Sequence, residues 1–201
     1  MTKQFVLRFA ALMLFGLVLP LRGQSESKPG ARLDLGDVRA VSRNTDDGGR
    51  LDALYVTLRL RTSDQQLVVA YRGESDGGRK VLSGFFVPDR GEPGSGGKTR
   101  HPVGAHLEVQ TTSGWQRPRA RTTRGVLGYL SIDKADAALI APRSEPSFDF
   151  LFSRRFFDVE PGQKLRVVVD AWPDAESMKV GGPCIQLTSP PFACPETGFG
   201  Q

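Results

Sequence analysis

Apolar and polar residues alternate along several segments of the chain, which is the pattern of β-strands with one buried face. In residues 51–61 the apolar members of this alternation are Leu54, Val56, Leu58 and Leu60. Residues 147–153 and 164–172 alternate in the same way. Shorter β-rich runs occupy residues 35–41, 66–71, 81–87, 106–111 and 125–132. We therefore expect about eight strands.

Clusters rich in Gly, Asp and Pro separate these runs, as connections between strands commonly do. Residues 160–163 read EPGQ. Pro and Gly at the two central positions favour a type II turn, so we expect an antiparallel connection there.

One segment is better suited to a helix. Around residues 133–141, Asp133 can cap a first turn, alanines favour helix, and Pro142 would end it. The sequence thus predicts one short helix near 133–141 in a chain that is otherwise all-β. The fold class that fits best is an antiparallel two-sheet sandwich of Ig-like or jelly-roll topology. A closed barrel is the alternative.

The first residues are typical of a signal peptide. Lys3 and Arg8 precede an uncharged run, Phe9–Leu19, which is too short to span a bilayer as a helix. We expect residues 1–23 to be a signal peptide, and the protein to be exported to the periplasm or the extracellular space. An uncleaved N-terminal anchor is the alternative. No later stretch has the composition of a transmembrane helix.

The remaining chain divides into three parts. Residues 24–31 are expected to be a disordered lead-in, residues 32–182 a single β-sandwich domain, and residues 183–201 a C-terminal tail. The net charge is +5 for the whole chain, but residues 1–23 contain three basic residues and no acid, so it is +2 for residues 24–201. Any affinity for polyanions must therefore come from a local arrangement of arginines.

Both cysteines lie near the C-terminus. Cys184 and Cys194 enclose nine residues that include Pro190 and Pro191. In an exported protein such a pair is expected to form a disulfide, which would fasten an irregular tail. Neither a CxxC spacing nor a nearby histidine supports a redox or metal site instead.

The most distinctive candidate site is a row of arginines. Arg117, Arg119 and Arg121 occupy alternate positions, with Trp115 two residues before the row and Arg124 after it. In an extended segment these side chains share a face, where guanidinium groups can pair with phosphate, sulfate or carboxylate groups. The alternative is that these charges only protect an edge strand from aggregation.

Other chemistries have less support. Surface aromatics such as Tyr55 could stack on sugars, and Asp46, Asp47 and Asp52 could offer oxygen ligands to calcium, but their spacing does not match a calcium loop. None of the GxSxG, HExxH or GxxxxGK[ST] motifs occurs. We expect no cofactor, no metal and no catalytic residue.

The sequence thus favours an exported, non-catalytic binding module that recognises an anionic glycan or envelope polymer. Two alternatives remain. One is a small secreted glycan hydrolase, which needs a facing pair of carboxylates. The other is an accessory domain that pairs with a protein partner through a sheet edge.

Overall fold

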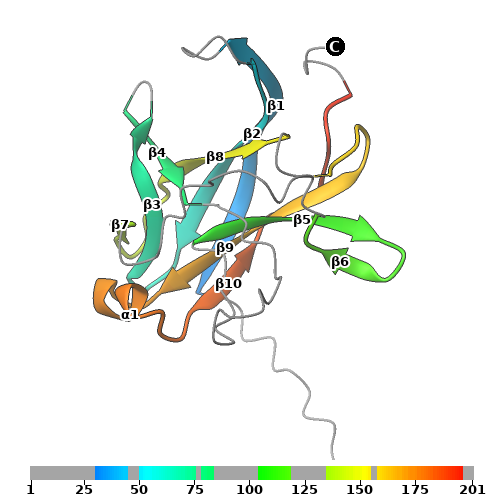
Figure 1. The fold of residues 1–201 in the computed structure, drawn as a ribbon. Helices are drawn as coiled ribbons and strands as arrows, with labels where there is room; N and C mark the ends of the chain where they lie inside the picture. Colours follow the sequence, from blue (N-terminus) through cyan, green and yellow to red (C-terminus); the bar gives the residue numbers. More distant parts are fainter. Residues whose placement is uncertain are drawn as a thin grey trace, which may run out of the picture.

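The computed structural model describes residues 30–44, 50–75, 78–83, 104–118, 135–154 and 158–196. Within these residues the chain forms strands and one short helix (Figure 1). The strands are β1 Ala31–Asn44, β2 Arg50–Thr62, β3 Leu67–Ser75, β4 Arg79–Leu82, β5 Ala105–Thr111, β6 Gly114–Gln116, β7 Asp136–Ile140, β8 Ser147–Ser153, β9 Lys164–Trp172, β10 Ile185–Thr188 and β11 Phe192–Ala193. The helix is α1, Ala175–Lys179. The all-β prediction is confirmed, although the described residues contain eleven strands where about eight were expected.

The strands form one continuous sheet, whereas two separate sheets were expected. Its order is β1-β2-β8-β4-β3-β9-β5-β6, with β7 attached to β3, and β10 and β11 attached to β9. The short strand β4 makes the continuity possible, because it pairs with β3 and also meets β8 through one parallel pair, Val81 with Asp149. The sheet curls into a half-barrel, and β5 and β9 cross over β1 and β2 in Figure 1.

The curled sheet encloses one main core. The expected inward residues of β2 and β8 are buried, and they pack in the same cluster as Leu165, Val167 and Val169 of β9. On β9 the opposite face is also covered, since Val168, Asp170 and Trp172 are buried. Trp172 at the end of β9 packs with Met178 of α1 in a second, smaller core cluster. Burial on both faces makes β9 the central strand of its half of the molecule.

The helix predicted near 133–141 is wrong, because residues Asp136–Ile140 form strand β7. They pair with β3 from Leu67–Ile140 to Tyr71–Asp136. Ala138 and Ile140 are buried while Leu139 is exposed, which is the period of a strand. Pairing with a buried neighbour here outweighs the weak helix preference of alanine.

The helix that does form, α1, starts at a cap that was not anticipated. The side chain of Asp174 accepts a hydrogen bond from the backbone N–H of Ser177 at 2.7 Å. Hydrogen bonds from Ser177 lower the pKa of Asp174, as expected of a carboxylate that caps a helix. The fully buried Met178 fixes the helix to the sheet.

The predicted turn at residues 160–163 is confirmed. The backbone N–H of Gln163 donates to the carbonyl oxygen of Glu160 at 3.2 Å, and Gly162 has a φ of 78°. A positive φ at this position is the mark of a type II turn. The strands on either side, β8 and β9, do not pair with each other but with β2 and β5 respectively.

The predicted disulfide is wrong, since Cys184 and Cys194 are both free. The segment between them does not fold back as a loop but runs along β9, where Ile185 is opposite Ala171 and Ala193 is opposite Lys164. Seven residues of strand separate these positions by about 23 Å. A disulfide needs Cα atoms within about 7 Å. Residues 185–188 and 192–193 are therefore held by strand pairing with β9.

The N-terminal boundaries can be compared only in part. Strand β1 begins at Ala31, which is buried, so the expected lead-in does not extend to residue 31. The expected signal peptide, residues 1–23, lies outside the described residues.

Candidate functional site

The register between β5 and β9 brings polar side chains together on the face of the sheet opposite the main core. His106 is opposite Val168, and Glu108 is opposite Arg166. One strand further along, Gln110 is opposite Trp115 of β6. Because directly paired residues project from the same side of a sheet, these side chains form one surface. We call His106, Glu108, Trp115, Arg117 and Arg166 the Arg166 patch.

A single glycine sets where this surface begins. Gly104 has a φ of 84°, and a Cβ at this position would lie 3.0 Å from the carbonyl oxygen of Ser83. Its own carbonyl accepts from the N–H of Asp170 at 2.8 Å, and the next N–H, that of Ala105, donates to Ser83 at 2.8 Å. These bonds fix the register that places Glu108 opposite Arg166.

Arg166 is the centre of the patch. Its Nε donates to Oε2 of Glu108 at 2.6 Å, and its guanidinium carbon lies 4.4 Å from the centroid of the Trp115 ring. The side chains of Arg166 and Glu108 remain 27% and 17% exposed. A guanidinium held over an indole and fixed by a carboxylate keeps its charge and has a restricted orientation.

His106 lies under this surface. It is only 5% exposed, and its Nε2 lies 3.5 Å from Oε1 of Glu108, while its Nδ1 has no hydrogen-bond partner. The pKa of His106 is lowered to about 4, first by burial and then by the positive charge of Arg117, with a smaller effect of Arg166. Glu108 opposes this shift. At neutral pH the imidazole is therefore uncharged.

The formal charge of the patch follows from these states. Arg117 and Arg166 contribute two positive charges, Glu108 contributes one negative charge, and His106 contributes none. These four side chains thus sum to a formal charge of +1, beside a partly exposed indole. Such a surface can pair with an anionic group and stack against a flat or apolar one.

The structure describes two of the five residues predicted for the arginine row. Trp115 is in β6, and Arg117 follows that strand and acts on His106 through its charge. Arg119, Arg121 and Arg124 lie outside the described residues. Arg166 was missed as a site residue. Its polar position in the alternation of residues 164–172 was visible, but the pairing of β9 with β5 was not.

The structure gives no added support to the other predicted sites, the surface aromatic for sugars and the aspartates for calcium. Tyr55 lies beneath Arg39, whose guanidinium carbon is 4.8 Å from the ring centroid. Asp46 and Asp47 lie outside the described residues, and Asp52 lies on β2 opposite Ser42. Within the described ranges no group of three His, Cys, Asp or Glu residues is placed to hold a metal ion.

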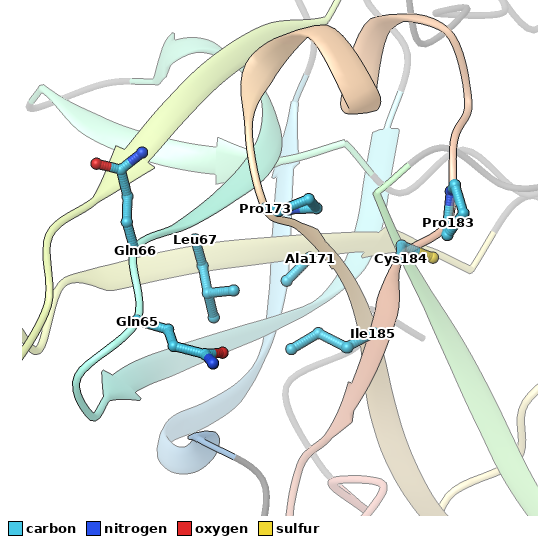
Figure 2. Close-up of a pocket in the computed structure, with 8 residues that line it drawn as sticks. All are labelled: Gln65, Gln66, Leu67, Ala171, Pro173, Pro183, Cys184 and Ile185. Carbon is cyan, nitrogen blue, oxygen red and sulfur yellow. The ribbon is translucent and has the colours of Figure 1, made fainter.

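A separate hollow of about 530 Å³ opens where β3 begins and β9 ends (Figure 2). It is lined by Gln65, Gln66, Leu67, Ala171, Pro173, Pro183, Cys184 and Ile185. None of these residues is a carboxylate. This hollow therefore lacks the facing pair of acids that a glycan hydrolase would need.

Comparisons with protein-family models, with curated proteins and with solved structures found no match for this chain. Among the residues that the structure describes, no helix is both long and apolar enough to cross a membrane. Function must therefore be inferred from the geometry of the chain itself.

Proposed function

We propose that this protein is an exported, non-catalytic binding module that holds an anionic glycan or envelope polymer on the Arg166 patch. The observation that carries the proposal is the fixed Arg166 guanidinium, which lies 4.4 Å from the Trp115 ring centroid and donates to the Glu108 carboxylate, with Arg117 near enough to His106 to lower its pKa. Export is proposed from the N-terminal segment, residues 1–23.

Each group has a distinct role in this proposal. Arg166 supplies an oriented pair of N–H donors for a sulfate or carboxylate, and Glu108 limits the conformations of its side chain. Trp115 offers the apolar surface on which a sugar ring can stack. Arg117 adds a second positive charge beside His106. The neutral state of His106 adds no charge to the patch at pH 7.

The proposal is tested by elution of residues 24–201 from immobilised heparin in a salt gradient. Arg166→Gln and Arg117→Gln each remove one charge from the patch, while Arg59→Gln removes one charge from an exposed position on β2. The three variants have the same net charge, so a difference between them reports position. We expect both patch variants to elute at clearly lower salt than the Arg59→Gln control.

A common small shift in all three variants would mean that retention depends only on net charge, and the proposal would be wrong. The proposal would also be wrong if the parent protein eluted below physiological salt. At that ionic strength charges more than about 8 Å apart are largely screened, so only a site that contacts the ligand directly would still retain the protein.

A further inference from the structure

We propose that the hollow at the start of β3 binds a small neutral molecule with an apolar body and one hydrogen-bonding group. This site is separate from the Arg166 patch and does not depend on the proposed function. Figure 2 shows three segments around it: the residues entering β3, the end of β9, and the residues entering β10.

The hollow exists because a small residue interrupts a row of larger ones. The core face of β9 carries Leu165, Val167 and Val169, and then Ala171. Ala171 is opposite Val69 on β3 and Ile185 on β10, so only a methyl group stands where larger side chains fill the rest of the row. A missing branch of this kind leaves space that neighbouring strands cannot close.

The walls of the hollow are apolar and continue into the core. Leu67 and Ala171 are 5% and 1% exposed and belong to the main core cluster. Ile185 on the opposite wall is 45% exposed, and it is one of the few large apolar side chains that the described residues leave open to solvent. A ligand lying between Leu67 and Ile185 would cover this apolar surface, which is favourable.

The rim of the hollow contains two prolines and no charged side chain. Pro173 and Pro183 border the hollow on two sides, and proline fixes the backbone and offers no N–H donor. In Figure 2 the side chain of Gln65 extends toward Ile185, whereas Gln66 and the sulfur of Cys184 point away from the hollow. Gln65 is thus the side chain placed to donate or accept one hydrogen bond.

These features select the class of ligand. A volume of about 530 Å³ is within the range of about 300–1,000 Å³ in which small-molecule sites are found. An ionised ligand would lose hydration without finding an opposite charge among the lining residues. A neutral molecule with an apolar chain or ring would lose little hydration and would bury both its own surface and that of Ile185.

The test uses N-phenyl-1-naphthylamine, a neutral apolar dye whose fluorescence rises in apolar surroundings. We expect saturable one-to-one binding to the parent protein. Ile185→Ser should weaken it about tenfold, because much of the covered apolar surface is lost. Leu151→Ser is the matched control, since Leu151 is a comparably exposed apolar residue, 38% exposed, on the outward face of β8. It should bind the dye like the parent.

A second variant and a competition make the test decisive. Ala171→Leu should fill the hollow and abolish dye binding, with cooperative urea unfolding as the check that the variant is folded. Octan-1-ol should displace the dye at lower concentration than octanoate does. The proposal is overturned if the parent shows no saturable binding, if Leu151→Ser and Ile185→Ser weaken it equally, or if octanoate is the better competitor.

Discussion

The two halves of the curled sheet each carry a polar cluster on the outward face, and the clusters differ in how their charges are balanced. On the β2–β8 half, Thr57 donates to Oδ1 of Asp149 at 3.1 Å, and Arg79 lies 3.0 Å from Oδ2 of the same carboxylate. Asp149 is completely buried. On the β5–β9 half, the Glu108 carboxylate accepts from Arg166 while Arg117 acts on His106 beside it, and both arginines remain partly exposed.

We propose that this difference separates a structural cluster from a surface able to bind an anion. One arginine and one carboxylate cancel at Asp149, and burial and the Asp149 carboxylate also raise the pKa of neighbouring Tyr55, which keeps that phenol uncharged. The cluster also lies where β4 meets β8, at the Val81–Asp149 pair. The Arg166 patch has two arginines and one carboxylate, and both arginines are partly exposed, so we propose that this patch, rather than the Asp149 cluster, meets an anionic ligand.

The largest expected effect is on the balanced cluster. Asp149→Ala should lower the free energy of unfolding by about 3 kcal/mol, because it removes a buried carboxylate from an arginine and a threonine; the 48% exposure of Arg79 keeps the loss at the low end for such pairs. Urea denaturation measures it.

Leu151→Ala, two residues further on the same face of β8, is the control and should cost well under 1 kcal/mol, because Leu151 is 38% exposed. Equal losses in the two variants would mean that Asp149 has no special role at the junction. Retention on heparin should not change in Leu151→Ala, which leaves every charge in place.

The next largest effect is the loss of stability at low pH that we expect from His106, on the β5–β9 half of the sheet. The pKa of His106 is about 4 in the folded protein and 6.5 in the unfolded chain, so the unfolded chain takes up the proton first as pH falls. Its contribution to stability is complete above pH 6.5 and is lost progressively between pH 6.5 and about 4. Between pH 7 and pH 5 the free energy of unfolding should therefore fall by about 2 kcal/mol on account of His106.

The comparison with His106→Gln isolates this contribution, since all other groups titrate in both proteins. Urea midpoints at pH 7 and pH 5 should fall less in the variant than in the parent. Parallel decreases in the two proteins would show that the imidazole near Glu108, Arg117 and Arg166 does not have a lowered pKa.

The smallest effect is expected at the C-terminal strands. Cys184→Ser should change the free energy of unfolding by less than about 0.5 kcal/mol, because the residue is exposed and unbridged. Thiol labelling should find two free thiols, with Cys184 reacting in the folded protein and Cys194 only after unfolding. Partial desolvation of the sulfur and the nearby Asp170 carboxylate raise the pKa of the Cys184 thiol, and burial raises that of Cys194, so labelling of Cys184 should be slow at neutral pH. If the variant instead lost about 2–3 kcal/mol of unfolding free energy, or if no free thiol were found, Cys184 and Cys194 would have to be bridged by a disulfide.

The sequence predicted local structure well where a period of two was unambiguous. The inward faces of β2, β8 and β9 and the turn at residues 160–163 follow directly from residue order. The segment 136–140 was misjudged because alanine has only a weak preference, which strand pairing with β3 overrides. The disulfide was misjudged because closeness in sequence does not give closeness in space once the segment is extended along β9.

The candidate site was predictable only in part, because the spacing along one strand does not show which strands become neighbours. Trp115 and Arg117 could be placed on one face from their spacing alone. The participation of Arg166, Glu108 and His106 depends on which strands become neighbours, and this is decided by contacts between residues about 50–60 positions apart. No local pattern contains that information.

We propose above all that the Arg166 patch binds an anion beside Trp115. The most direct test of this claim is a tryptophan fluorescence titration with a defined heparin oligosaccharide, in the parent and in Trp115→Phe. Trp172 is buried and is present in both proteins, so the difference reports Trp115. We expect a saturable change in the parent that is absent in Trp115→Phe and much weakened in Arg166→Gln. An identical titration in all three proteins would contradict the claim.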